Sequence, residues 1–288
     1  MLLQQILNGL TMGSIYALVA IGVTMIFKSM GMLNVAHGDT IMLSSFIAIT
    51  LIGLGIPFYM ALILTIIAVF LYGLFSEKFI YRRLNYDSFT NLLIATIGMS
   101  IILRNGSIAI WGAEPRLFPN IFSDTPIIIN GYSILPQNIG IILVSLLLMG
   151  LLQVFFYKTK LGKSMRAAST DPEGASMIGI NVSLTRFLTF GISSALGAIA
   201  GILLAPMFNV TPDMGAVVVL KGFSAAIMGG FGNIIGAMIG GPILGIIEAM
   251  SATYISSAYR DVIAYIVLIG VLYFKPTGFL GKRTDQKL

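Results

Sequence analysis

One long uncharged stretch constrains the fold of this chain more than any other feature. From Thr40 to Ser76 no residue is charged, and most residues are apolar. A helix needs about 20 mainly apolar residues to cross the hydrocarbon core of a bilayer, where its backbone groups must be satisfied internally. This stretch is too long for one crossing, and Gly53, Gly55 and Pro57 supply a turn in its middle. The sequence therefore predicts two consecutive membrane helices here.

The composition of the whole chain extends this argument. Of its 288 residues, 57% are hydrophobic and 10% are charged, whereas an ordinary soluble domain has about 45–50% apolar and about 25% charged residues. The charged residues are confined to short islands between apolar runs. We therefore expect an all-α polytopic integral membrane protein. The N-terminal segment has no basic region before its apolar stretch, which predicts a retained first helix rather than a cleaved signal peptide.

The same length rule places the remaining spans. The segment 112–137 contains four prolines and several charges, which predicts an extracytoplasmic loop rather than a helix. A glycine-rich region is interrupted at 229–233, which indicates either two short helices or a re-entrant pair. The predicted spans are residues 2–27, about 32–54, about 57–75, about 89–111, about 138–157, about 187–207, one or two passages within 217–250, and about 262–274.

The basic residues predict the orientation. Cytoplasmic loops of membrane proteins carry an excess of Lys and Arg. If the segments 28–31, 77–87 and 158–186 and the basic tail are cytoplasmic, only four of the 17 Lys and Arg residues lie elsewhere: Arg104, Arg116, Lys221 and Arg260. This puts the N-terminus outside and the C-terminus inside. An odd number of crossings follows, nine or seven, and a count of eight requires one assignment to be wrong; we expect about eight to nine transmembrane helices.

Several function classes are disfavoured by what the chain contains. The bases flank apolar segments instead of forming a stripe, which argues against nucleic-acid binding despite a net charge of +6. There is no cysteine and only one histidine, so neither a metal site nor general acid–base catalysis is expected. Gly162-Lys163-Ser164 resembles the end of a phosphate-binding loop, but Tyr157 stands where that motif requires glycine. We expect no enzyme activity, no cofactor and no ATP hydrolysis by this chain.

Four ionisable residues fall well inside the predicted spans: His37, Asp39, Arg104 and Glu248. Such residues are costly in lipid and are often functional. His37 could form an interhelical hydrogen bond; alternatively, a break at this point could direct a helix N-terminus toward a substrate carboxylate. Arg104 either pairs with an acid or lies near a loop, and Glu248 is expected at an extracytoplasmic helix end. These few residues give thin support for a self-contained proton or sodium relay.

Glycines four residues apart mark helix faces that allow close backbone approach. Close packing of helices is one interpretation of them. For the series Gly232, Gly236 and Gly240, a moving or substrate-lining element is the alternative interpretation. The pairs and the series are Gly9 and Gly13, Gly197 and Gly201, and Gly232, Gly236 and Gly240.

The polar segment 158–186 contains the signals of a short capped helix. Thr170 or Asp171 can cap it, Pro172 suits its first position, and Glu173 places a negative charge in its first turn. Gly179 is expected to end it. We interpret this helix as a docking element for a cytoplasmic partner; an interfacial helix that lies on the bilayer is the alternative.

Four segments resemble a known family in order along nearly the whole chain. They are residues 8–18 (NGLTMGSIYAL), 34–39 (NVAHGD), 161–180, which begin LGK and end GI, and 275–281 (KPTGFLG). These segments resemble the branched-chain amino acid permease family of bacterial ABC importers, and more narrowly its "H"-type membrane subunit. The Asn-x-Ala-His-Gly pattern is the most specific part. Asp39 and Lys275 stand where Glu and Arg are common in the family.

The resemblance implies a function and a set of partners. It implies that residues 1–288 form a single permease domain of the bacterial inner membrane, which imports branched-chain or other hydrophobic amino acids. The implied partners are a second homologous permease subunit, two cytoplasmic ATPases that bind the ATP, and a periplasmic binding protein. Alternatives are a permease for urea, short amides or other amino acids, and, from another class, a stand-alone carrier or channel.

The resemblance also assigns two groups of candidate residues. It implies that the cytoplasmic loop 158–186 is the coupling loop that contacts the ATPase. The candidate coupling residues are Arg166, Asp171, Glu173, Gly174 and Gly179. The candidate residues of the translocation path are Asn34, His37, Gly38 and Asp39.

Overall fold

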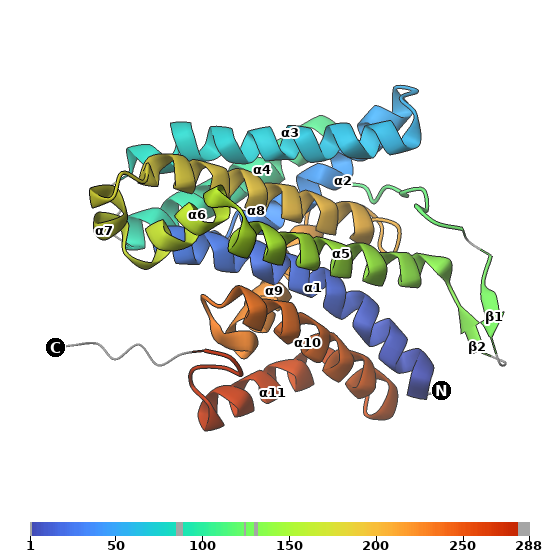
Figure 1. Ribbon diagram of the computed structural model, residues 1–288. Helices are drawn as coiled ribbons and strands as arrows, with labels where there is room; N and C mark the ends of the chain where they lie inside the picture. Colours follow the sequence, from blue (N-terminus) through green and yellow to red (C-terminus); the bar gives the residue numbers. More distant parts are fainter. Residues whose placement is uncertain (1, 85–88, 124, 130–131, 282–288) are drawn as a thin grey trace. The chain divides into compact units, whose positions relative to one another are not determined.

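The computed structural model describes residues 2–84, 89–123, 125–129 and 132–281. Helices dominate these residues, so the expected all-α membrane class is confirmed (Figure 1). In chain order, the elements are α1 (Leu2–Met30), α2 (His37–Gly53), α3 (Phe58–Phe79), a 3₁₀ turn η1 (Tyr81–Arg83), α4 (Phe89–Trp111), β1 (Ile127–Ile129), β2 (Tyr132–Ile134), α5 (Pro136–Lys158), α6 (Lys160–Thr170), α7 (Pro172–Met177), α8 (Val182–Leu204), α9 (Met214–Gly230), α10 (Ile234–Tyr254) and α11 (Arg260–Phe274).

The predicted spans correspond to helices, with differences at their ends. Within the described residues, six helices are long and apolar enough to cross a bilayer: α1, α3, α4, α5, α8 and α10. The helices α2 and α9 are apolar but shorter. The number of crossings, about eight to nine, therefore stays a prediction. The helix α2 begins at His37 and not near residue 32. Gly31, with a φ of 66°, ends α1, and residues 31–36 form a non-helical connection.

The segment 158–186, which the sequence analysis describes as a polar loop, is mostly helical. It contains α6 and α7 and the first turn of α8. Thr159 and Asn181 cap α6 and α8, because their side-chain oxygens accept hydrogen bonds from the backbone N–H groups of Gly162 and Leu184. Similarly, the proline-rich segment 112–137 is not entirely irregular: β1 and β2 pair in antiparallel register, with Ile127 opposite Ile134.

Some predictions fall on residues that lie outside the described part of the chain. These are the tail residues Lys282, Arg283 and Lys287, the end of the expected polar loop at residues 85–88, and Asp124.

The described chain divides into two compact units, and the first comprises Met1–Thr24, Asn120–Leu146 and Leu220–Leu288. In this unit the predicted glycine pair Gly9 and Gly13 lets α1 approach the backbone of α10. A Cβ atom added at Gly9 would lie 2.7 Å from the Cα atom of Ile246, and one at Gly13 would lie 2.6 Å from the Cα atom of Pro242. The helix-packing interpretation of this pair is therefore confirmed.

The break between α9 and α10 is also held within this unit. Asn233 caps α10 through bonds from the N–H groups of Ile235 and Gly236. The segment after α11 returns to this break: the N–H of Phe279 donates to the carbonyl of Met228, 2.9 Å away, and the Asn233 side-chain amide donates to the carbonyl of Leu280 at 2.8 Å.

The second unit comprises Met25–Pro119 and Leu147–Val219. Its helix α8 packs along α2 and α3, where a Cβ atom at Gly73 would lie 2.6 Å from the carbonyl oxygen of Phe190. A buried cluster consists of Ile26, Met30, Met32, Tyr81, Leu92 and Phe190. Large apolar side chains of α3 and α4 are exposed, among them Ile63, Leu71 and Ile102. Apolar surface of this extent is what a lipid-facing helix presents.

Candidate functional site

The histidine singled out by the sequence lies at the contact between α2 and α8. The side chain of His37 is fully buried, and its Nδ1 atom is 3.4 Å from the hydroxyl of Ser193 in α8. Within the described residues, its buried Nε2 atom has no hydrogen-bond partner. A Cβ atom at Gly197 would lie 3.2 Å from the Cε1 atom of this ring. His37 thus makes an interhelical contact, and its place on a translocation path stays a prediction.

The backbone N–H groups in the first turn of α2 are hydrogen-bonded to carbonyls of the residues just before them. The N–H groups of His37, Gly38 and Asp39 donate to the carbonyls of Asn34, Val35 and Ala36, at 3.3, 3.4 and 3.1 Å. In this structure these amides are therefore not open to a substrate carboxylate. A Cβ atom at Gly38 would lie 2.6 Å from the carbonyl oxygen of Gly215, so this glycine permits a close backbone approach.

Arg104 connects two acidic residues next to this turn. Its Nε atom is 4.0 Å from a carboxylate oxygen of Asp39, and its Nη1 atom is 3.3 Å from one of Asp213. Asp39 is buried, whereas the Asp213 side chain is 77% exposed. Of the two alternatives for Arg104, the structure supports pairing. The four candidate path residues, Asn34, His37, Gly38 and Asp39, all lie at or just before the start of α2, and Asn34, His37 and Asp39 are buried.

The segment 158–186 has the caps that the sequence predicts for α7. The Asp171 carboxylate accepts a bond from the N–H of Gly174 at 2.9 Å, and Pro172 takes the first position of α7. After the helix, Gly179 has a φ of 83°, and its N–H and that of Ile180 bond back to the carbonyls of Ser176 and Ala175, both at 3.0 Å. This pair of backbone hydrogen bonds is the Schellman motif, for which glycine is the favoured residue.

The other candidate coupling residues differ in exposure. The Arg166 guanidinium stacks on the ring of Tyr157, 4.3 Å from its centroid, and is only half-exposed. Glu173 is exposed, and so are the apolar side chains of Met177 and Ile178, at 86% and 76%. Asp171, Gly174 and Gly179 therefore shape α7, whereas Glu173 and its apolar neighbours face outward.

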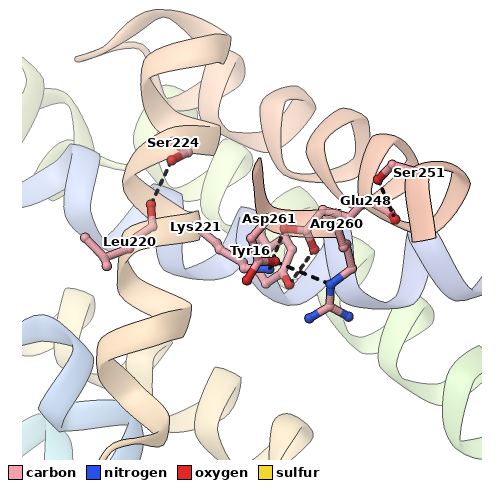
Figure 2. Close-up of polar contacts among 8 residues, drawn as sticks. All are labelled: Tyr16, Leu220, Lys221, Ser224, Glu248, Ser251, Arg260 and Asp261. Carbon is pink, nitrogen blue, oxygen red and sulfur yellow. Dashed lines mark hydrogen bonds and ion pairs between the residues drawn. The ribbon is translucent and has the colours of Figure 1, made fainter. Parts of the chain in front are cut away.

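One cluster of charged side chains was missed in the sequence analysis (Figure 2). The ammonium group of Lys221 in α9 donates to carboxylate oxygens of Glu248 in α10, at 2.5 Å, and of Asp261 in α11, at 2.7 Å. The Tyr16 hydroxyl of α1 donates to the other Glu248 oxygen at 2.9 Å. Lys221 and Glu248 are buried, so Glu248 is an interior residue of this unit.

Arg260 completes this ionic cluster. Its Nε atom is 3.4 Å from Asp261. Two bases and two acids leave the cluster neutral; Lys221 and Glu248 form its buried ion pair, whereas the side chains of Arg260 and Asp261 are half-exposed. One feature of the sequence could have indicated this cluster: a lysine and a glutamate lie inside apolar, glycine-rich helices, where burying an ionisable side chain costs free energy.

Comparison with known proteins identifies the family. The sequence profile of the family described as "Branched-chain amino acid transport system / permease component" matches residues 5–272. The chain belongs to this family. Its members are permease components and not enzymes, which confirms the expected absence of catalytic activity, and the family match together with the apolar helices of this chain makes it a membrane permease component.

Permease proteins with similar sequences align with nearly the full chain. The high-affinity branched-chain amino acid transport system permease protein BraD of Pseudomonas aeruginosa is 39% identical, over 99% of this chain and 98% of its own. The corresponding protein LivH of Salmonella typhimurium is 38% identical, over 99% and 97%. The ribose import permease protein RbsC of Haemophilus influenzae is 23% identical, over 93% and 84%.

A solved structure supports the same fold for this permease. A chain of PsaBC from Streptococcus pneumoniae, determined in complex with Fab, matches with a TM-score of 0.54 over 94% of this chain and 91% of that chain. The sequences are 14% identical, so the likeness concerns the fold alone.

Proposed function

We propose that this chain is the permease subunit of an ATP-driven importer of branched-chain amino acids. The observation that carries the proposal is similarity over nearly the entire length, at 37–39% identity, to permease proteins named for high-affinity branched-chain amino acid transport. Residues 1–288 then act as one permease domain, although they divide into two compact units. The energy comes from partner subunits, and this chain binds no cofactor itself.

The proposed partners are a second homologous permease subunit, two cytoplasmic ATPases that bind ATP, and a periplasmic binding protein. The segment 158–186 is the proposed ATPase contact. Its support is that α7 has a cap at each end and still presents Met177 and Ile178 to the exterior. Exposed apolar side chains beside a charged residue, here Glu173, form the kind of small patch that a partner protein covers.

The proposed location is the bacterial inner membrane, with the N-terminus outside and the C-terminus in the cytoplasm. The support is the distribution of Lys and Arg, because cytoplasmic loops of membrane proteins carry an excess of these residues and the segment 158–186 is rich in them. In this orientation, Asn34, His37, Gly38 and Asp39 are the proposed path residues. Their support is that three of them are polar and buried within a mainly apolar unit, where polar groups are costly unless they have a role.

Purification from native membranes tests the proposal. A tagged chain is solubilised in detergent, and the proteins that accompany it are identified by mass spectrometry and assayed for ATP hydrolysis. We expect soluble ATPases and a second permease subunit. Recovery of the chain alone, with transport retained after reconstitution, would instead support a carrier or channel; uptake of urea, short amides or other amino acids in place of leucine would change the substrate assignment.

A further inference from the structure

A small cavity opens beside the ionic cluster in the first unit. Its volume is about 180 Å³, and α1, α10 and the start of α11 supply its walls. Drug-sized ligands occupy pockets of roughly 300–1,000 Å³, so this cavity suits a smaller molecule. Its wall includes the charged side chains of Glu248 and Arg260 and the apolar or small side chains of Met12, Ala249 and Ala252.

The two charged side chains in the wall, Arg260 and Glu248, can both form further hydrogen bonds. Arg260 donates to Asp261 through its Nε atom alone. Within the described residues, its two terminal nitrogens have no hydrogen-bond partner, and Figure 2 shows them pointing away from the cluster. Each oxygen of the Glu248 carboxylate accepts one bond, from Lys221 or from Tyr16. A carboxylate has about four acceptor positions, so this group can accept further donors.

Charge balance selects the class of ligand. Lys221, Arg260, Glu248 and Asp261 sum to zero, and the side chains of Lys221 and Glu248 are buried, whereas those of Arg260 and Asp261 are 43% and 49% exposed. A ligand with a net charge would leave an uncompensated charge next to the buried Lys221–Glu248 pair. A ligand with one positive and one negative group preserves neutrality. Its anionic group can bind the guanidinium of Arg260 through two parallel bonds, and its cationic group can donate to Glu248.

We propose that this cavity binds the head group of an α-amino acid zwitterion, with the carboxylate at Arg260, the ammonium at Glu248 and the aliphatic side chain against Met12 and Ala252. The proposal rests on the proposed function for the choice of a branched-chain amino acid. In the predicted orientation, the N-terminal part of α1 lies in the extracytoplasmic half of the membrane, which is the side from which an importer receives its substrate.

Binding of labelled L-leucine tests the proposal directly. The full chain and its co-purifying subunits are reconstituted in nanodiscs of phosphatidylglycerol, without a soluble binding protein. We expect saturable leucine binding. We expect 4-methylpentanoate, which lacks the amine, and 3-methylbutylamine, which lacks the carboxylate, to compete at least about tenfold more weakly, because each forfeits one charged hydrogen-bonding group.

Two variants and one control locate the site. Ala252→Leu fills the cavity and Arg260→Gln removes the anion partner; each should weaken leucine binding about tenfold or more. Thr253→Leu introduces the same leucine side chain at an exposed neighbouring position that does not line the cavity, and this variant should bind leucine as the unmodified chain does. Gel filtration of all three must show the same assembled complex.

Several outcomes would overturn the proposal. Equal leucine binding by the Ala252→Leu and Thr253→Leu variants would do so, as would saturable binding of labelled phosphatidylethanolamine without any leucine binding, which would indicate a lipid site. ATP-driven leucine uptake that is insensitive to both cavity variants would reject the cavity and keep the proposed function. A complex that neither binds nor transports leucine would reject both.

Discussion

At the scale of single residues, the ionic cluster carries the largest energetic consequence. Breaking a buried ion pair by removing one partner costs about 3–5 kcal/mol, because the remaining charge stays in a poorly solvated place. We therefore expect Lys221→Met to lower the free energy of unfolding by about this amount, since Glu248 and Asp261 would lose their shared ammonium partner. Chemical denaturation in detergent micelles measures the change.

The control for this prediction is the double variant Lys221→Met with Glu248→Gln. Removing both buried charges should recover much of the lost stability, because a neutral amide is far cheaper to bury than a carboxylate. A Lys221→Met chain with an unchanged denaturation midpoint would mean that the cluster is solvated and contributes little.

At the scale of elements, the packing of α1 on α10 depends on the absence of side chains. A Cβ atom at Gly13 would come within 2.7 Å of the carbonyl oxygen of Gly241. We expect Gly13→Ala to destabilise the protein by about 1–3 kcal/mol, because the two helices would have to move apart. Gly106→Ala in α4 is the matched control: nothing lies within 4 Å of that site, so stability should stay equal or rise by up to about 1 kcal/mol.

Thermal unfolding of both glycine variants in the same detergent makes the comparison. Equal melting temperatures would contradict the close approach of α1 and α10. The same approach, at Gly245 and Gly9, forms part of the wall beside the proposed amino-acid cavity.

The caps of α7 could be predicted from the sequence, whereas the ionic cluster could not. Asp171 and Gly174 are three residues apart, and the bonds around Gly179 are equally local, so the residue types alone specify them. In contrast, Lys221 meets Glu248 and Asp261 across 27 and 40 residues, and Tyr16 meets Glu248 across 232. Those pairings depend on how helices pack, about which a hydropathy pattern says nothing.

In the segment 158–186, residue polarity alone led to a wrong prediction of secondary structure. Its polarity suggested a loop, but most of it is helical because Thr159, Asp171 and Asn181 each cap a helix. Polarity predicts exposure to water, and a helix outside the bilayer satisfies that condition as well as a loop does. At the start of α2, the sequence motif marks Asn34, His37, Gly38 and Asp39, whose place on a translocation path stays a prediction. That the backbone N–H groups of this turn are hydrogen-bonded within it became evident only from the structure.

At the scale of the whole molecule, coupling to an ATPase should depend on the exposed face of α7. We expect Glu173→Arg to preserve folding, since the residue is exposed, and to reduce ATP-dependent uptake by about tenfold or more, the effect of losing a charged contact of about 1.4 kcal/mol. The rates of leucine uptake and of ATP hydrolysis are both measured, and the number of ATP molecules hydrolysed per leucine imported should rise because uptake falls more than hydrolysis.

The matched control reverses another exposed acid at the side predicted to be extracytoplasmic. Glu114→Arg should leave the ratio of hydrolysis to uptake unchanged, because this residue lies far along the chain from the coupling segment and in the proline-rich loop. A similar loss of coupling in both variants would show that the effect comes from net charge and not from an ATPase contact.

The most direct test of the central claim is uptake of labelled leucine by proteoliposomes that contain the chain with its co-purifying subunits and, on the outside, the binding protein. The proposed function predicts accumulation that requires ATP inside the vesicles and stops when hydrolysis is blocked. Leucine accumulation by the chain alone, independent of ATP, would contradict it.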